Sequence, residues 1–271
     1  MTPSLGLLWM LVAPAHACPF DDAGAGEAPL SVLTFNAWGL PRPVAVDRRG
    51  RLPRIAGWLE DQGYDVAGLQ ELWRGAVRLF PWSRGGLTAP MGARGDSGLA
   101  LVTPHEVRDT RLYEYAAERG FDAWKAKGLL MAELVVDDGR EVTVGVTHLQ
   151  AGGSARNASV RAAQIDELLG QLGDDDRATV LMGDFNLYAD QPADAASWKR
   201  LEDAGFVDVA AASGETRGTY PGRTDRFDRI YVRDGASRCW VPRRAEVIDP
   251  DRGGLSDHRA VEAEMTHRRR P

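Results

Sequence analysis

The sequence has few cysteines, few histidines and no long apolar run. Its 271 residues include 2 cysteines, Cys18 and Cys239, and 5 histidines. The chain can therefore form at most one internal disulfide, and it has no Cys/His cluster of the kind that binds zinc. Both a Cys18–Cys239 disulfide and two free thiols are compatible with the sequence. The apolar stretch at residues 5–12 is too short to span a bilayer as a permanent helix.

An excess of positive charge is also missing. Lys and Arg number 33 against 39 Asp and Glu, which gives a net charge of −6 and a pI near 5.5. This balance argues against a protein whose main task is to grip long nucleic acid, although it leaves room for a local basic cleft. With 44% hydrophobic and 27% charged residues and no repeat, the chain is typical of a globular protein.

The N-terminal segment has the pattern of an export signal. An apolar stretch is followed by Ala15-His16-Ala17, which resembles a signal-peptidase site. We therefore expect residues 1–17 to be a signal peptide and the protein to be secreted or periplasmic. A lipoprotein anchored at Cys18 is a minor alternative, because His16 fits a lipobox poorly. We expect a flexible segment at 18–29, one domain at 30–266, a solvated basic tail at 267–271, and a monomer.

Residues 178–190, Ala-Thr-Val-Leu-Met-Gly-Asp-Phe-Asn-Leu-Tyr-Ala-Asp, are the most informative stretch. The run 179–182 is apolar and rich in β-branched residues, which predicts a strand buried on both faces, and Gly183 favours a turn after it. Side chains two apart in an extended chain point the same way, so Asp184 and Asn186 would face one cleft. Such a pair can hold a water and a phosphoryl oxygen, but Gly-Asp-Phe-Asn is also compatible with a simple turn.

Apolar periodicity predicts alternating strands and helices along the rest of the chain. The expected strands are 31–35, 65–70, 97–102, 129–136, 141–146, 179–182, 226–232 and 245–248, with a last strand after His258. The expected helices are 52–62, 155–172 and 198–204. Residues 129–136 and 141–146 should form a hairpin, and the Gly-, Pro- and Arg-rich segment 74–96 should be a long loop over the cleft.

Polar side chains recur where these strands end. They are Asn36, Glu71, His148, Asp184, Asn186, Asp228, Asp257 and His258. In an α/β sheet, ligands bind at the carboxyl ends of the strands. The pattern therefore predicts one site to which most strands contribute a side chain.

Together, these strand ends and their neighbours resemble the endonuclease/exonuclease/phosphatase superfamily of magnesium-dependent phosphoesterases. The resemblance covers about residues 30–264 and implies a four-layer α/β sandwich of the DNase I type, with two packed mixed β-sheets flanked by helices. It also implies Mg²⁺, or Mn²⁺, held on the side of Glu71 and Asn36 with Asp257 close to the ion. Carboxylate and amide oxygens are the ligands that such hard cations prefer.

The resemblance also implies roles for the other strand-end residues. His148 and Asn186 would bind the phosphate, and Asp184 would help to orient the attacking water. His258 would be the general base, with Asp228 fixing its tautomer, since imidazole titrates near neutral pH. With these positions filled, we expect an enzyme rather than a binding module on a catalytically dead fold.

Within the superfamily, four local strings are similar to neutral sphingomyelinases. They are Asn-Ala-Trp-Gly-Leu-Pro at 36–41, Leu-Gln-Glu-Leu-Trp at 69–73, Thr-His-Leu-Gln-Ala at 147–151, and Asp122 followed by Lys127-Gly128. In that family the Asp and Lys form a pair that gates the site.

These strings favour a phospholipid phosphodiesterase that acts on a lipid headgroup at a membrane or micelle surface, which Phe80 and Trp82 would contact. A secreted DNase-like nuclease and a soluble phosphate-ester phosphatase are the alternatives.

Overall fold

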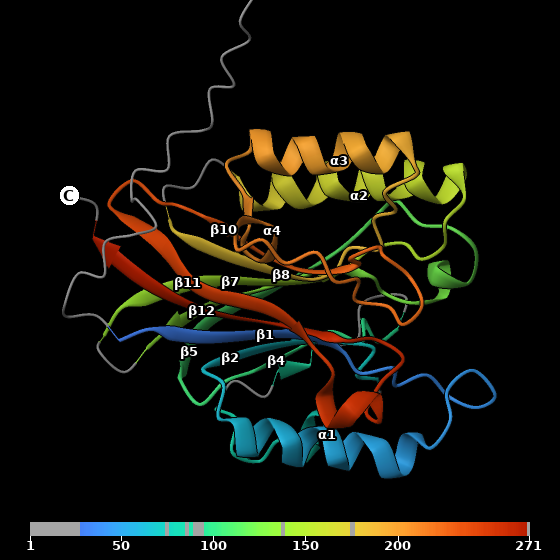
Figure 1. Ribbon diagram of the computed structural model, residues 1–271, viewed down its shortest axis with the longest axis horizontal. Helices are drawn as coiled ribbons and strands as arrows, with labels where there is room; N and C mark the ends of the chain where they lie inside the picture. The colour runs from blue at the N-terminus through green and yellow to red at the C-terminus, as the bar shows by residue number, and fades with distance from the viewer. Residues whose placement is uncertain are drawn as a thin grey trace, which may run out of the picture.

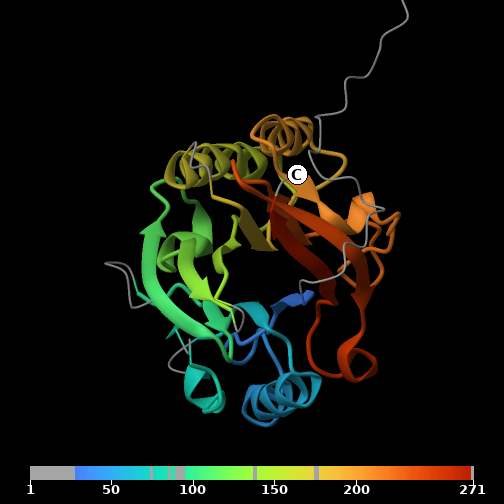
Figure 2. The same cartoon turned by 90° about the vertical axis from the view of Figure 1, so that its left-hand side faces the viewer.

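The computed structural model describes residues 28–73, 76–84, 87–88, 95–136, 139–173 and 177–269. Two mixed six-stranded sheets pack face to face, with strand orders β11-β12-β1-β2-β4-β3 and β5-β6-β7-β8-β10-β9. Helix α1 covers the outer face of the first sheet, and α2 and α3 cover that of the second (Figures 1 and 2). The predicted four-layer α/β sandwich is confirmed.

The first sheet contains strands from both ends of the described chain. Its members are β1 (Leu30–Asn36), β2 (Val66–Gln70), β3 (Leu87–Thr88), β4 (Ala100–Val102), β11 (Arg238–Ile248) and β12 (Ala260–Arg269). The second sheet consists of β5 (Glu106–Glu114), β6 (Gly128–Val135), β7 (Glu141–His148), β8 (Thr179–Asp184), β9 (Val207–Asp208) and β10 (Asp228–Arg233). The helices are α1 (Arg48–Gln62), α2 (Ala155–Leu172), α3 (Pro192–Asp203) and α4 (Val209–Ala212), with 3₁₀ turns η1 (Ala76–Leu79), η2 (Gly120–Trp124) and η3 (Pro250–Gly253).

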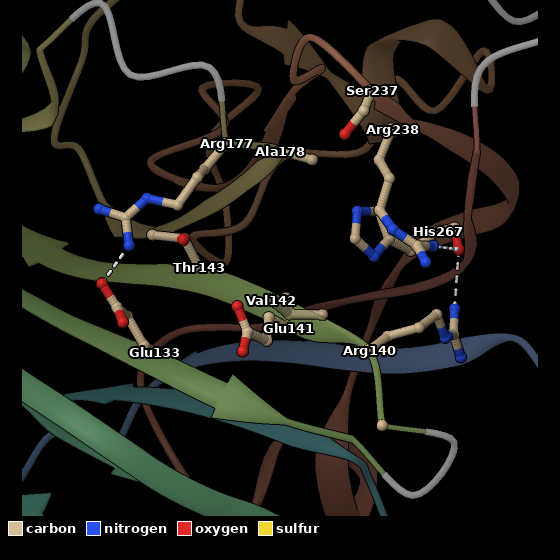
Figure 3. Close-up of a pocket in the computed structure, with 11 residues that line it drawn as sticks. Glu133, Arg140, Glu141, Val142, Thr143, Arg177, Ala178, Ser237, Arg238 and His267 are labelled. Carbon is tan, nitrogen blue, oxygen red and sulfur yellow. Dashed lines mark hydrogen bonds and ion pairs between the residues drawn. The ribbon is translucent and has the colours of Figure 1, made fainter.

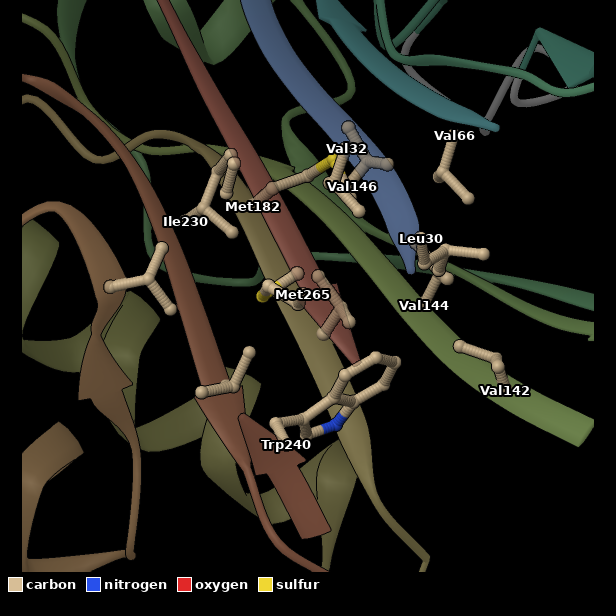
Figure 4. Packing of buried hydrophobic residues seen from close by; sticks show 14 of the residues in the cluster. Leu30, Val32, Val66, Val142, Val144, Val146, Met182, Ile230, Trp240 and Met265 are labelled. Atoms are coloured by element: carbon tan, nitrogen blue, oxygen red, sulfur yellow. The ribbon is translucent and has the colours of Figure 1, made fainter. Parts of the chain in front are cut away.

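The largest apolar cluster lies between the two sheets (Figure 4). Val32 and Met265 of the first sheet pack there with Val146 and Met182 of the second, and all four are almost fully buried. Gly68 of β2 is needed at this interface, because a Cβ there would lie 2.5 Å from the Met182 sulfur. A side chain at position 68 would force the Met182 side chain out of its place between the sheets.

The outer helices pack through one apolar face each. Ile55 and Leu59 of α1 cover the first sheet, and Ile165 and Leu168 of α2 cover the second. Helix α2 has the predicted bounds because local signals mark both ends: the Ser154 side chain accepts the first-turn N–H, and a glycine follows the last residue. Among the described residues, no helix has the length and apolar character to cross a bilayer.

Two predictions need correction in the first sheet. Strand β11 begins at Arg238, seven residues before the predicted start at 245, and β12 runs to Arg269. His267 is therefore no part of a solvated tail. It is 1% exposed, pairs with Trp240 across the two strands and stacks on that indole at 4.4 Å. Strand pairing thus overrides the local basic composition.

The segment after β2 also differs from the expected loop. Its described part contains η1 and β3, and Phe80 is only 2% exposed. Phe80 and Trp82 both pack against the cluster beneath α1. The prediction of contact with a lipid surface is therefore wrong for Phe80, whereas Trp82 is partly exposed and its contact with lipid stays a prediction.

The N-terminal predictions fall outside the described residues. The expected signal peptide at 1–17 and nearly all of the flexible segment at 18–29 precede residue 28, as does Cys18. Cys239 is fully buried in β11 and is disulfide-bonded.

Candidate active site

The strand register brings the predicted polar residues to one end of the sheets. Strands β7 and β8 run parallel with His148 opposite Asp184, and β10 runs antiparallel with Asp228 opposite the same Asp184. Strand β1 of the facing sheet ends at Asn36, whose side chain reaches Asp184. Three strands of one sheet and one strand of the other therefore meet at a single carboxylate.

Asp184 is the centre of this arrangement. Its Oδ2 accepts a hydrogen bond of 3.0 Å from the Asn36 side chain and lies 3.4 Å from Nε2 of His148, while its Oδ1 accepts one of 3.0 Å from the Asn186 N–H. Burial, and then the charge of Asp228, raise the pKa of Asp184. The site can therefore hold a negative charge only if donors or a cation surround it.

His258 and Asp228 form a close pair. Nδ1 of the ring lies 2.7 Å from Oδ2 of Asp228, and Nε2 faces Asp184 at 3.9 Å. Burial alone would lower the pKa of His258, but the facing charges of Asp228, Asp184 and Asp257 raise it to about 10. Asp228 therefore fixes the ring orientation and leaves Nε2 to exchange a proton at the centre of the site.

His148 has the opposite electrostatics. It is 2% exposed, and burial followed by the nearby charges of Lys127 and Lys125 lowers its pKa well below the usual value. Its ring is therefore neutral at physiological pH, and it can donate a hydrogen bond without adding a proton-transfer group. Within the described chain its Nδ1 has no hydrogen-bond partner.

Glu71 lies directly after β2 in a left-handed conformation with φ of 57°. Its Oε2 is buried and has no hydrogen-bond partner among the described residues, and burial raises the pKa of the carboxyl. Leaving a buried carboxylate oxygen without a partner is costly. A divalent cation with oxygen ligands would relieve that cost, so the residues present fit such an ion.

The described residues contain one group of acidic and histidine side chains that could hold a metal ion, namely Asp184, Asp228 and His258, whose ligand atoms lie within 4.8 Å of one another. The predicted metal residues Glu71, Asn36 and Asp257 are not part of that group. Asp257 is partly exposed, and burial raises the pKa of its carboxyl. Which oxygens hold the ion therefore stays a prediction.

The predicted gating pair is also present at the site. The Lys127 ammonium lies 3.0 Å from Asp122 and donates to the Leu149 carbonyl at 2.5 Å, the carbonyl to which Asn186 also donates. Asp122 in turn accepts hydrogen bonds from the Ala151 N–H and the Gln150 amide. The pair is therefore locked against the 149–151 segment that follows His148.

Both charges of this pair are buried. Burial lowers the pKa of Lys127, and the charge of Asp122 opposes that shift. Burial also works against ionisation of Asp122, but Lys127 and the Ala151 N–H outweigh it and hold the pKa of that carboxyl below its usual value. The buried ammonium thus lies close to Asn186, with which it shares the Leu149 carbonyl and which is expected to bind a phosphate.

The residue that holds the site's loops together, Arg51, is not among the residues predicted from the sequence. Arg51 is 3% exposed and donates to the backbone carbonyls of Ala37, Trp38 and Leu255 at 2.6 to 2.9 Å. It joins the segment after Asn36 to the one before Asp257. The only signal in the sequence was its place beside the apolar stripe of the first helix.

A separate pocket of about 290 Å³ lies at the opposite end of β7, where that strand begins (Figure 3). Several of its charged side chains already have partners: Arg177 pairs with Glu133, and Arg140 donates to the His267 carbonyl. None of the strand-end residues lines it. The candidate active site is therefore at the other end of the sheets.

A family model described as Endonuclease/Exonuclease/phosphatase family matches residues 33–258. The chain belongs to this family. Among curated proteins, it is 24% identical over 286 residues to human Sphingomyelin phosphodiesterase 2, an alignment that covers 89% of this chain and 66% of the relative. The chain spans about half to two thirds of the length of the curated relatives it matches.

Two solved structures show the same fold as this family member. Sphingomyelinase C from Streptomyces griseocarneus superposes with a TM-score of 0.65 at 21% identity, covering 87% of this chain and 99% of that one. A beta toxin variant from Staphylococcus aureus with bound magnesium ions superposes with a TM-score of 0.69 at 17% identity, with the same coverage. The predicted superfamily, with its resemblance to neutral sphingomyelinases, is confirmed.

Proposed function

We propose that this protein is a magnesium-dependent phosphodiesterase that releases the phosphorylated headgroup of sphingomyelin or a similar phospholipid. The observation that carries the proposal is the buried Asp122–Lys127 pair, held beside Asn186 and His148 by the 149–151 segment. Similarity to proteins named as sphingomyelinases supports the choice of a lipid substrate.

In this proposal Glu71, Asn36 and Asp257 hold Mg²⁺, or Mn²⁺ in its place. When bound, the ion supplies positive charge to meet the charge that develops on the phosphate and the leaving oxygen. His258 is protonated at neutral pH in the metal-free protein, and it would act as a base only with that positive charge nearby, since a cation opposes protonation of the ring.

Side chains of the protein carry out proton transfer, water orientation and phosphate binding. Nε2 of His258 accepts the proton of the attacking water, and Asp228 holds the ring in the orientation that this transfer needs. Asp184 orients that water. His148 and Asn186 donate hydrogen bonds to the phosphoryl oxygens, and Lys127 adds positive charge beside them.

Two exposed aromatic side chains support action at a lipid surface. Phe121 and Trp124 flank Asp122 in η2 and are 87% and 81% exposed. Val44 and Val46, in the segment between β1 and α1, are 62% and 58% exposed. Phe121 and Trp124 lie in the same turn as Asp122, and exposed aromatic side chains next to a site fit an interaction surface. In this proposal Phe121 and Trp124 contact the lipid surface, the role that the sequence predicted for Phe80 and Trp82.

A substrate panel tests the function. Purified mature protein with Mg²⁺ should release phosphocholine from sphingomyelin in detergent faster than it nicks plasmid DNA, and its rate should depend weakly on salt. The DNA affinity of a nuclease would instead fall steeply with salt, because that affinity comes from many phosphate contacts. Faster nicking with a steep salt dependence would assign the site to a nuclease.

The surface proposal needs a separate test. The double variant Phe121→Ser/Trp124→Ser should bind sphingomyelin vesicles more weakly than the wild type in a sedimentation assay. Its turnover of vesicle lipid should fall more than its turnover of soluble bis(p-nitrophenyl) phosphate. Lys199→Ser, which changes an exposed side chain on α3, is the control and should bind vesicles like the wild type. Equal vesicle binding by the variant and the wild type would refute the surface.

A further inference from the structure

An aromatic cluster lies beside His258 on the side of the segment that leads into β10. The Tyr220 ring centroid is 5.2 Å from that of His258, and the Phe227 ring centroid is 6.5 Å away. Tyr188 packs on Phe227 at 4.8 Å. The cluster therefore forms a wall next to the proton-transfer group, and none of its three rings has a role in the function proposed above.

The backbone ties this wall to the catalytic strands. Phe227 immediately precedes Asp228, and its carbonyl accepts a hydrogen bond of 2.8 Å from the Phe185 N–H. Tyr188 follows Asn186 by two residues, and its N–H donates to Asp194 at 3.0 Å. The two rings are thus held at fixed positions next to the residues that would bind the phosphate.

A cation already occupies the face of this wall. The Arg223 guanidinium lies 5.2 Å from the Tyr188 ring centroid and 5.6 Å from that of Phe227, and it pairs with Asp225 at 2.8 Å. The Arg223 side chain is 45% exposed, whereas that of Asp225 is 12% exposed. Aromatic faces with a carboxylate beside them are the chemistry that recognises quaternary ammonium groups.

The exposed arginine can exchange with a ligand, but a second arginine at the wall cannot. Arg161 also lies over the Tyr188 ring at 5.1 Å, yet it is fully buried and forms a two-point ion pair with Asp194. Arg223 pairs with Asp225 through a side chain that is itself 45% exposed, and solvent weakens an ion pair with an exposed partner. Moving Arg223 away would uncover the faces of Tyr188 and Phe227 that it covers and free Oδ2 of Asp225, while Oδ1 keeps its hydrogen bond from the Ala189 N–H.

We propose that Tyr188, Phe227 and Asp225 form a subsite for the quaternary ammonium of a choline-type headgroup, and that Arg223 occupies it until the headgroup displaces its guanidinium. The inference rests on the proposed function, because it assigns the headgroup of that substrate. A two-carbon spacer joins phosphate and ammonium in such a headgroup, so the ammonium must bind close to the phosphate. Tyr188 lies two residues after Asn186, and the Phe227 ring lies beside His258, so both are close to the expected phosphate position.

Binding of the free headgroup tests the subsite without requiring lipid turnover. Phosphocholine and inorganic phosphate are titrated into the full-length mature protein with Mg²⁺, and the ratio of their affinities is measured by calorimetry. Tyr188→Leu should lower the ratio by about 3-fold to 30-fold, and Tyr188→Phe, which keeps the ring, should preserve it. Arg223→Ala should raise the ratio, because it removes the competing cation.

A matched control removes a similar arginine elsewhere. Arg233 covers the Phe206 ring at 4.9 Å and lies at the end of β10 farthest from Asp228, so Arg233→Ala should leave the ratio unchanged. If Arg223 instead binds phosphate groups, Arg223→Ala will weaken binding of both phosphate and phosphocholine, and the proposal is overturned. An unchanged ratio in folded Tyr188→Leu protein would also overturn it.

Turnover distinguishes failure of the subsite from failure of the proposed function. Wild type should hydrolyse sphingomyelin faster than ceramide phosphoethanolamine, and Tyr188→Leu should reduce that preference. If wild type cleaves bis(p-nitrophenyl) phosphate but neither lipid, the lipid function fails. In that case the titrations with phosphocholine still show whether the subsite binds a quaternary ammonium.

Discussion

Nδ1 of His258 lies 2.7 Å from Oδ2 of Asp228, and these two side chains come from segments that neither neighbour each other in sequence nor belong to the same sheet. Asp228 opens β10 in the second sheet, whereas His258 lies in the loop before β12 of the first. Their contact, together with the bond from Asn36 to Asp184, links the two sheets across the site. Proper packing of the two sheets is therefore a condition for the chemistry.

The first prediction concerns Glu71. Glu71→Gln should stabilise the metal-free fold, because it removes a buried carboxylate whose oxygen has no partner among the described residues. The same change should abolish most of the rise in melting temperature that Mg²⁺ produces in the wild type, since ligands that bind only the folded state stabilise it. Thermal unfolding in EDTA and in a Mg²⁺ series measures both effects.

An equal Mg²⁺-dependent shift in Glu71→Gln and wild type would contradict the role of Glu71 in metal binding. Glu60→Gln, which changes an exposed glutamate on α1, is the matched control and should respond to Mg²⁺ like the wild type.

The second prediction concerns the Asp122–Lys127 pair. Asp122→Asn should destabilise the fold by about 3 kcal/mol, because it leaves the buried Lys127 ammonium without its carboxylate. The double variant Asp122→Asn/Lys127→Met should recover much of that loss and stay poorly active. Urea unfolding of the two single variants and the double variant gives the coupling free energy. If the changes in the free energy of unfolding of the two single variants add up to that of the double variant, the two charges do not stabilise each other.

The third prediction is a pH dependence of stability. In the folded, metal-free protein the pKa of His258 is raised from 6.5 to about 10, chiefly because Asp228 faces the ring and outweighs the effect of burial. Protonation of His258 therefore stabilises the fold fully below about pH 6.5, and this stabilisation is lost as the pH rises through about 10. In EDTA, the melting temperature of wild type relative to His258→Gln should fall over that range. A difference that stays constant with pH would contradict the raised pKa.

The elements that could be predicted from the sequence are those whose signals are local. Helix α2 has an N-cap serine, an apolar stripe and a terminal glycine, and it was predicted with its observed bounds. The polar residues at strand ends were likewise visible, because strands of an α/β sheet present their carboxyl ends to one site.

The rest depends on contacts between distant segments. The start of β11 and the end of β12 are set by their pairing with each other, and His267 is buried because Trp240 stacks on it. Arg51 bonds to carbonyls on two loops, one of them 204 residues away. The Arg223 guanidinium lies over Tyr188 and Phe227 only in the folded chain. No local pattern of residue types encodes such contacts.

The fourth prediction concerns export, which remains a proposal. Expressed in a bacterium with its own N-terminus, the protein should lose residues 1–17 and begin at Cys18. Intact-mass spectrometry of protein from the periplasm or the medium measures this. Retention of Met1 would refute the cleavage, and a lipid-sized mass increase on Cys18 would identify a lipoprotein.

We propose that the Asp184, Asp228 and His258 centre hydrolyses phosphodiesters. Hydrolysis of bis(p-nitrophenyl) phosphate with Mg²⁺ by wild type and by His258→Ala tests it most directly, since this soluble substrate needs neither a lipid surface nor a headgroup. His258→Ala should lose about 10²-fold to 10⁴-fold in turnover, while its circular dichroism spectrum stays that of the wild type. Equal turnover by the two folded proteins would contradict it.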